Sequence, residues 1–140
     1  MMSANKEILA MVLQLIWSEG QVDKVDDYIA PTYTIYHDPG DPFDGQVLDI
    51  EGYKHRLQTS RGPFPDQKFE TLEMIEEGDK VVVSWNGPGT HLGDFPGFPA
   101  SGKVIKMTGM TIYSFTDGKV SGHWQMVDRL SVFQQLAAPS

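Results

Sequence analysis

The chain has 140 residues and a mass of 15.6 kDa, which predicts a single domain over residues 1–140. With 19 acidic and 11 basic residues, its formal charge is -8, which opposes binding to nucleic acid or to an anionic membrane surface. The absence of cysteine excludes disulfides, thiolate nucleophiles and cysteine-ligated metal sites.

The first part of the chain predicts two helices and a strand. Ser3 or Asn5 caps a helix that runs to about Ser18, and this helix is apolar on so many sides that it must be buried. Its apolar run, residues 8–17, is far shorter than the ~20 residues of a membrane span. No signal-peptide pattern is present, so we expect a cytoplasmic protein. A short helix over residues 22–29 and a β-branched, aromatic strand over residues 32–37 follow.

The rest of the chain predicts one more helix and then strands. Residues 38–45 contain three acids, two prolines and two glycines and predict a loop before a helix over residues 49–60. From residue 68 the apolar residues recur with a period of two, which predicts strands over residues 69–76, 81–86, 104–115 and 120–127. A Pro/Gly-rich loop covers residues 93–102, and residues 131–137 predict a last helical turn.

This order of elements, helices first and antiparallel strands afterwards, is typical of the α+β class. We expect a curved, mostly antiparallel sheet that wraps around three N-terminal helices as a cone-shaped barrel, with a pocket between the sheet and the helices. Val82, Ile112 and Trp124 are candidates for the opposite face of the sheet. Because a monomer rarely exposes so much apolar area, we expect a homodimer that covers this face.

Two polar residues on the last long strand are candidates for chemistry. Strand alternation places Ser121, His123 and Gln125 on one face, and Val120, Gly122, Trp124 and Met126 on the other. His123 is a candidate base, or else a histidine packed on the sheet or in a subunit contact. Gln125 is a candidate donor to a carbonyl or enolate oxygen, or else an amide bonded to a neighbouring side chain or to water.

Two further pairs of titratable residues lie next to loops. His37 and Asp38 lie where a strand meets a Pro-rich loop, which suits either a pocket rim or a turn, and His37 is a second candidate base. His91 and Asp94 are placed in the same way beside the other loop. The four histidines form no metal-ligand motif, and the chain has no phosphate-binding glycine loop. We therefore expect neither a metal nor an organic cofactor.

Aromatic residues and methionines are numerous enough to line an apolar cavity, although most aromatics in a small domain belong to its core. An apolar pocket with a few polar groups is the usual form of a small-molecule site. We expect a small apolar molecule to contact Trp17, Tyr33, Phe64, Trp85, His91, Met107, Thr111 and Tyr113.

Short motifs recur in a familiar order along the chain. They are Asn5-Lys6-Glu7, Trp17-Ser18-Glu19-Gly20, Ala30-Pro31-Thr32-Tyr33, His37-Asp38-Pro39, Phe64-Pro65-Asp66, Glu77-Gly78-Asp79-Lys80-Val81, Gly89-Thr90-His91, Ser101-Gly102-Lys103, Asp117-Gly118-Lys119-Val120 and His123-Trp124. Together they resemble the SnoaL-like polyketide (ester) cyclases over nearly the whole chain. The resemblance implies the nuclear-transport-factor-2-like cone and a cofactor-free enzyme that closes a ring by intramolecular aldol condensation.

The sequence departs from this family at the position that carries the chemistry. In the family, the segment that corresponds to His123-Trp124-Gln125 commonly reads His-Trp-Asp, and the aspartate is the general acid/base. An amide such as Gln125 cannot take a proton from carbon at neutral pH. A second polar position of the family falls near Thr111, which also does not titrate.

Three functions therefore stay open at the level of the sequence. The first is a cyclase with His123 or His37 as the base and Gln125 as the donor to the developing oxyanion. The second is a hydrolase or dehydratase of the same fold that uses His37, Asp38, His91 and Asp94. The third is a small-molecule binding protein without catalysis.

Overall fold

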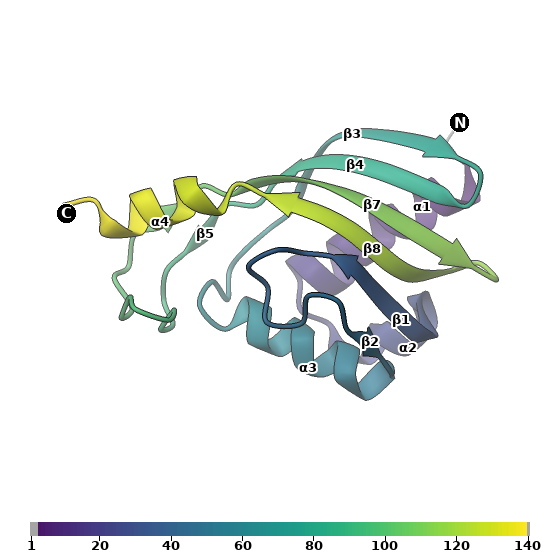
Figure 1. Cartoon of the computed structure of the whole chain (residues 1–140), viewed down its shortest axis with the longest axis horizontal. Helices are drawn as coiled ribbons and strands as arrows, with labels where there is room; N and C mark the ends of the chain where they lie inside the picture. Colours follow the sequence, from purple (N-terminus) through teal and green to yellow (C-terminus); the bar gives the residue numbers. More distant parts are fainter. Residues whose placement is uncertain (1–2, 140) are drawn as a thin grey trace.

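The computed structural model describes residues 3–139, which form a curved six-stranded sheet with helices on its concave side (Figure 1). The helix α1 (Ala4–Met11) begins at Ser3, whose hydroxyl oxygen accepts a hydrogen bond from the Lys6 N–H, as the sequence predicts. It continues directly as a π-helix, η1 (Val12–Ser18), in which five of the seven residues are buried. This burial explains the wide apolar surface of the first helix.

The second helix is shorter than expected. It consists of the 3-10 turn η2 (Val22–Lys24) and α2 (Val25–Tyr28), and the strand β1 (Ile29–His37) then begins three residues before the predicted start. Pro31 lies inside β1. The two-residue strand β2 (Val47–Leu48), which the sequence did not predict, pairs only with Tyr33 and Thr34. β1 is therefore an edge strand on that side at Pro31, where a missing N–H is tolerated.

The helix α3 (Ile50–Arg61) begins where the sequence predicts, because the Asp49 carboxylate accepts a hydrogen bond from the Gly52 N–H at 2.7 Å. The hairpins β3 (Glu70–Glu77) with β4 (Lys80–Asn86) and β7 (Thr108–Thr116) with β8 (Lys119–Val127) also match the prediction. The remaining elements are β5 (Gly89–Thr90), β6 (Val104–Ile105) and α4 (Arg129–Ala137).

The strand expected over residues 104–115 is divided into β6 and β7. Between them, the Lys106 N–H donates to the Gln135 side chain of α4, and the Met107 carbonyl accepts from the Gly87 N–H. These bonds take the main chain out of the regular ladder. Met107 is half-buried at this break and packs against both hydrophobic clusters of the molecule.

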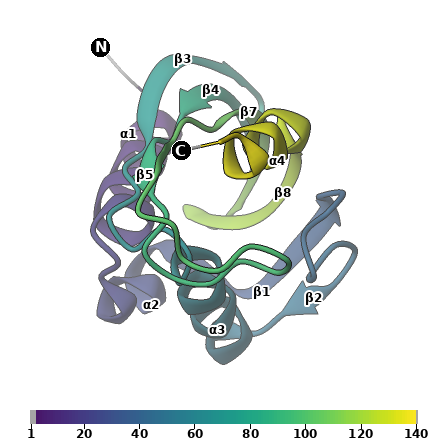
Figure 2. The same ribbon diagram turned by 90° about the vertical axis from the view of Figure 1, so that its left-hand side faces the viewer.

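The strand order is β2-β1-β8-β7-β4-β3, and among residues 3–139 only the β1–β8 pair is parallel. This confirms the α+β class and the curved sheet around three N-terminal helices, which Figure 2 shows from one end of the molecule. The sheet does not close into a barrel, since its edge strands β2 and β3 are not paired with each other. No helix within residues 3–139 is long and apolar enough to cross a membrane.

Two hydrophobic clusters hold the elements together. The larger one lies between the concave face of the sheet and the helices, and it includes Leu9, Ile16, Ile35, Leu57 and Val83. The smaller one packs α4 and the loop at residues 91–103 against the rest of the chain and consists of Phe64, Ile105, Val132 and Leu136. Burial of these apolar surfaces is the main force that stabilises the cone.

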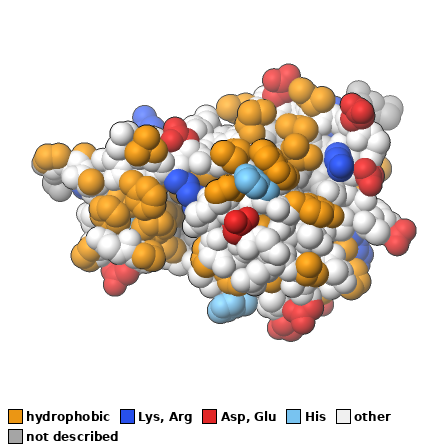
Figure 3. Space-filling model, in the orientation of Figure 1, with side chains coloured by type: hydrophobic (Ala, Val, Ile, Leu, Met, Phe, Trp, Pro, Cys, Tyr) orange, Lys and Arg blue, Asp and Glu red, His pale blue; other side chains and the backbone are white. Residues whose placement is uncertain are grey.

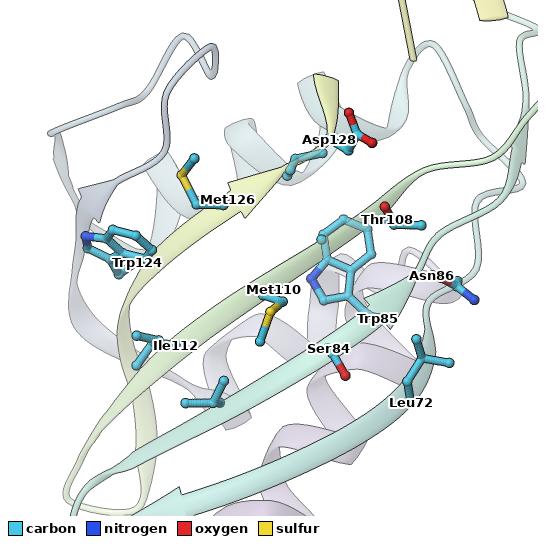
Figure 4. A pocket seen from close by; sticks show the side chains of 13 residues that line it. Leu72, Ser84, Trp85, Asn86, Thr108, Met110, Ile112, Trp124, Met126 and Asp128 are labelled. Atoms are coloured by element: carbon cyan, nitrogen blue, oxygen red, sulfur yellow. The ribbon is translucent and has the colours of Figure 1, made fainter. Parts of the chain in front are cut away.

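The convex face of the sheet is the apolar outer surface that the sequence predicts. Figure 3 shows hydrophobic side chains gathered over the strands on this face. Val82, Ile112 and Trp124 line a shallow groove of about 670 Å³ there, together with Leu72 and other residues (Figure 4). Trp124 is 42% exposed and Leu72 is 62% exposed, so the groove is open to solvent in a single chain.

Candidate active site

A second, more enclosed cavity of about 260 Å³ lies between the concave face of the sheet, the helices and the loops. Six of the eight residues expected above to contact a ligand line it, and so do both candidate residues of β8. The lining thus includes Trp17, Tyr33, Phe64, Trp85, Met107, Tyr113, His123 and Gln125. The wall is therefore mostly apolar, with polar groups concentrated where β8 meets β1 and α3.

The other candidate residues lie elsewhere. His91 is fully buried outside the cavity lining, and its Nδ1 is 2.9 Å from the Ser101 hydroxyl oxygen. Thr111 is fully buried, also outside the lining, where its hydroxyl bonds to Gln125. His37 lies outside the cavity, and its ring stacks on Trp124 with centroids 4.6 Å apart and an interplanar angle of 12°.

An irregularity in β1 explains the position of His37. Ile35 pairs with His123 and His37 pairs with Trp124, so two steps along β1 correspond to one step along β8. Such a β-bulge shifts the alternation of the strand by one residue. Regular alternation from Ile35 would turn His37 towards the cavity, whereas the bulge turns His37 outwards and places Asp38 on the inner side. Asp38 is only 1% exposed.

Four donors surround the Asp38 carboxylate. Its Oδ2 accepts hydrogen bonds from His123 Nε2 at 2.8 Å, Arg56 Nη2 at 3.0 Å and Gln125 Nε2 at 3.1 Å. Its Oδ1 accepts a bond from Arg129 Nη2 at 3.2 Å. Burial alone would raise the pKa of Asp38, but the His123 bond and the charges of Arg56 and Arg129 together hold this pKa below its ordinary 3.8. Asp38 is therefore an anion at neutral pH.

The ionised Asp38 determines the proton positions on His123. A carboxylate can only accept, so His123 Nε2 carries a proton. Burial lowers the pKa of His123 below 6.5, although the Asp38 bond opposes this shift, and the imidazole is neutral at pH 7. Nδ1 thus has a free electron pair and accepts a hydrogen bond from the Tyr33 hydroxyl at 2.6 Å. Burial raises the pKa of Tyr33 well above 10, which keeps its phenol protonated.

A second series of hydrogen bonds fixes the orientation of Gln125. The indole N–H of Trp85 can only donate, and its acceptor is Thr111 Oγ1 at 2.9 Å. The Thr111 hydroxyl donates in turn to Gln125 Oε1 at 2.7 Å, which turns the amide nitrogen towards Asp38. The second amide N–H of Gln125 makes no hydrogen bond within the part of the chain that the structure describes. Gln125 therefore supports Asp38 as an anion, and it also lines the cavity.

Sequence reasoning did not find Arg56 and Arg129, which complete this network. Arg129 follows β8 at the start of α4, and its Nε donates to the Pro39 carbonyl at 2.8 Å, so it holds the chain next to Asp38. Arg56 lies on the buried face of α3, between Tyr53 and Leu57 at helical spacing. A charged residue on such a buried stripe is a signal that was available in the sequence.

The chemistry available at this site is acid–base chemistry. Tyr33 and His123 line the cavity, whereas Asp38 lies behind them and is absent from its lining. Within residues 3–139, no group of three or more His, Asp or Glu residues is arranged to hold a metal ion. The arrangement can accept a proton from the cavity at a neutral histidine that a buried carboxylate stabilises once it is charged.

Comparison with known proteins agrees with the fold. The profile of the SnoaL-like polyketide cyclase family matches residues 7–136. The aklanonic acid methyl ester cyclase AcmA of Streptomyces galilaeus is 24% identical over 136 residues, which cover 95% of this chain and 92% of AcmA. The cyclase of the same name from Streptomyces peucetius, DnrD, is 23% identical over 128 residues, which cover 88% of this chain and 84% of DnrD.

Solved structures are also similar. A proposed polyketide cyclase from Acidithiobacillus ferrooxidans is 51% identical, with a TM-score of 0.92 and coverage of 96% of this chain and 94% of that chain. IdmH, a proposed polyketide cyclase from Streptomyces antibioticus, is 24% identical, with a TM-score of 0.83 and coverage of 96% and 99%.

Proposed function

This chain belongs to the SnoaL-like polyketide cyclase family, and we propose that it is a cofactor-free cyclase acting on a small, apolar carbonyl compound. In this proposal, it removes a proton from a carbon next to a carbonyl and closes a ring by intramolecular aldol addition. The observation that carries the proposal is the series of hydrogen bonds from Asp38 through His123 to Tyr33 in the wall of an apolar cavity.

Tyr33 and His123 together act as the base. The proton leaves the substrate carbon for the Tyr33 oxygen while the Tyr33 hydroxyl proton moves to His123 Nδ1, and the electron pair of the broken C–H bond forms the enolate. Asp38 stabilises the imidazolium that results, because it is an anion held 2.8 Å from Nε2. The enolate carbon then attacks the second carbonyl, and the new alkoxide takes the proton back through Tyr33.

With Tyr33 and His123 as the base, the proposed reaction does not require an aspartate at position 125. Gln125 cannot accept a proton, but its amide N–H bonds to Asp38 and helps to keep that carboxylate ionised. The carboxylate thus comes from the loop residue that follows β1 rather than from β8. The cavity also contributes to catalysis, since it holds the substrate in a folded shape and excludes water from the enolate.

No observation favours the hydrolase or dehydratase hypothesis. His37 stacks on the convex face, His91 is enclosed behind the cavity wall, and the Asp94 carboxylate accepts the Ala100 N–H at 3.0 Å. These side chains do not join Asp38 in one site. A cytoplasmic location stays a prediction from the sequence.

We also propose that the protein is a homodimer through its convex face. The groove in Figure 4 is lined by large apolar side chains, among them Met110, Trp124 and Met126, which are 56%, 42% and 50% exposed. Water contact with this much apolar surface is unfavourable, and a second copy of the same mostly apolar groove would cover it.

The function is tested with a short acyclic diketone that can close to a six-membered ring. We expect wild-type protein to form the cyclic product without added metal or cofactor, and we expect Tyr33→Phe and His123→Ala to abolish this activity. Lys24→Gln, a change on η2 away from the cavity lining, serves as the control. Binding without turnover by wild type would favour the non-catalytic binding protein instead. Full activity in both site variants would contradict the proposed base.

A further inference from the structure

Arg56 has hydrogen-bond donors that find no acceptor among residues 3–139. Its side chain is 6% exposed, and Nη2 donates to Asp38 at 3.0 Å and to Asp41 at 3.2 Å. Nε is buried and has no hydrogen-bond partner among residues 3–139. Nη1 also makes no hydrogen bond within these residues, but unlike Nε it is not fully buried. A donor without a partner in a buried side chain is unfavourable, and of these two nitrogens only Nη1 could be reached by a ligand.

The guanidinium lies in the cavity wall next to the proposed base. Arg56 lines the cavity together with Tyr33 and His123, and its Nη2 shares the Oδ2 atom of Asp38 with His123 Nε2. Its Cζ atom lies over the Trp17 ring, 5.3 Å from the ring centroid. Packing and the two carboxylates thus fix the guanidinium in place before any ligand binds, which is what a preorganised donor requires.

The charges of this wall are balanced. Arg56 and Arg129 face Asp38 and Asp41, and the His123 imidazole is neutral at pH 7. A buried carboxylate on the ligand would meet no net positive charge to offset the loss of its hydration. An uncharged ligand with a carbonyl oxygen fits better, because that oxygen can accept from the Nη1 N–H groups of Arg56, which are not fully buried.

We propose that Arg56 is the oxyanion donor of this site, and that the ligand is a neutral β-dicarbonyl compound whose carbonyl oxygen binds the guanidinium. This inference rests on the proposed function. A carbon between two carbonyls is far more acidic than a carbon beside only one, which suits a neutral histidine as the base. When the C–H bond breaks, its electron pair moves onto the oxygen at Arg56 and the proton moves through Tyr33 to His123. The total charge of the site is unchanged.

Benzoylacetone is a suitable probe, because the enolate of this β-diketone has its own ultraviolet absorption. We measure the ratio of enolate to neutral probe bound at pH 7 to wild type and to the double variant Arg56→Gln/Asp41→Asn. The double variant removes one positive and one negative charge, so the wall stays balanced. We expect the bound ratio to fall at least about tenfold, since the loss of one oxyanion donor costs about 10²–10³ in other enzymes. Arg56→Lys keeps the positive charge but lacks the planar guanidinium, so the bound enolate ratio should fall by an intermediate amount.

Lys54→Gln is the matched control, because Lys54 lies on the same helix and pairs with Asp26 at 2.8 Å outside the cavity. It should bind the probe with the wild-type ratio. Circular dichroism identifies which Arg56 variants are folded, and a wild-type ratio in every folded one overturns the proposal. So does a failure of wild type to bind the probe at millimolar concentration.

Failure of this inference is distinguishable from failure of the proposed function. If ring closure depends on Tyr33 and His123 while the Arg56 variants keep the wild-type enolate ratio, the base is correct and the oxyanion site is wrong. If the enolate ratio depends on Arg56 while ring closure does not depend on Tyr33 and His123, the oxyanion site is correct and the base is wrong.

Discussion

Asp38→Asn is the substitution that tests the candidate site most directly. All four side chains around the Asp38 carboxylate donate to it, and three of them donate to the same oxygen, Oδ2. An asparagine of the same shape would present one NH₂ group to these donors and would remove the negative charge between Arg56 and Arg129. We expect a less stable protein whose ring-closing activity is almost lost.

The magnitude follows from the burial of the pair. Asp38 is 1% exposed and the Arg56 side chain is 6% exposed, so solvent screens their interaction little. Removal of one partner from a buried ion pair typically costs about 3–5 kcal/mol. Arg129 is 28% exposed and adds less. For activity, a similar change of the carboxylate that orients a catalytic histidine lowers kcat by about 10⁴ in serine proteases.

Urea unfolding followed by tryptophan fluorescence measures the loss of stability, with Asp94→Asn as the control. Asp94 is exposed and its carboxylate accepts a backbone N–H, so its change should cost only about 0.5–1.5 kcal/mol. The pKa of Asp38 is lower in the folded protein than its ordinary 3.8. The contribution of Asp38 to stability is therefore complete above pH 3.8 and is lost as the pH falls through the lower folded value.

The difference in the free energy of unfolding between wild type and Asp38→Asn should accordingly persist down to pH 3.8 and become smaller below it. Equal losses in Asp38→Asn and Asp94→Asn at pH 7 would refute the buried ion-pair network. A gap that stays constant through strongly acidic pH would refute the ionised state of Asp38.

Three further predictions concern the interface, the pH response and the packing of the sheet. Trp124→Glu should convert the proposed dimer to a monomer by light scattering, whereas a monomeric wild type at micromolar concentration would contradict the dimer. The pKa of His123 is below 6.5 in the folded protein, so its contribution to the free energy of unfolding is complete above pH 6.5 and decreases on acidification. His123→Gln should remove this decrease when urea unfolding is measured over a series of pH values. An unchanged pH dependence of the free energy of unfolding would contradict the lowered pKa of His123. Gly122→Ala should lower stability by about 1–3 kcal/mol, because the added Cβ would lie 2.6 Å from the Thr34 carbonyl oxygen, whereas Gly62→Ala meets only ordinary contacts at 3.5 Å. Equal stability of these two glycine variants in thermal unfolding would show that β1 can move away from Gly122.

Local patterns in the sequence determined most of the secondary structure. The Ser3 and Asp49 caps set the starts of α1 and α3, and the period of two set the hairpins β3–β4 and β7–β8. The same period correctly turned His123 and Gln125 to one face of β8 and Trp124 to the other. The same period predicted the wrong face for Val120, which is fully buried in the main core. The reason is that the pairing of β7 with β8 shifts between Ser114 and Phe115. Where strands pair regularly, the side-chain direction follows from position alone.

Only the tertiary structure decided which acid and which histidine share a site. The bulge opposite His123 and Trp124 exchanges the directions of His37 and Asp38, and a strict two-residue period contains no sign of it. The Asp38–His123 bond joins residues 85 positions apart, so its existence depends on how β1 and β8 are placed side by side. Arg56 shows the same limit: the spacing of α3 could indicate a buried charge, but the carboxylates that balance this charge come from a separate loop. The sequence determines which side chains can ionise or donate hydrogen bonds, whereas the pairing of buried charges depends on the register between distant strands.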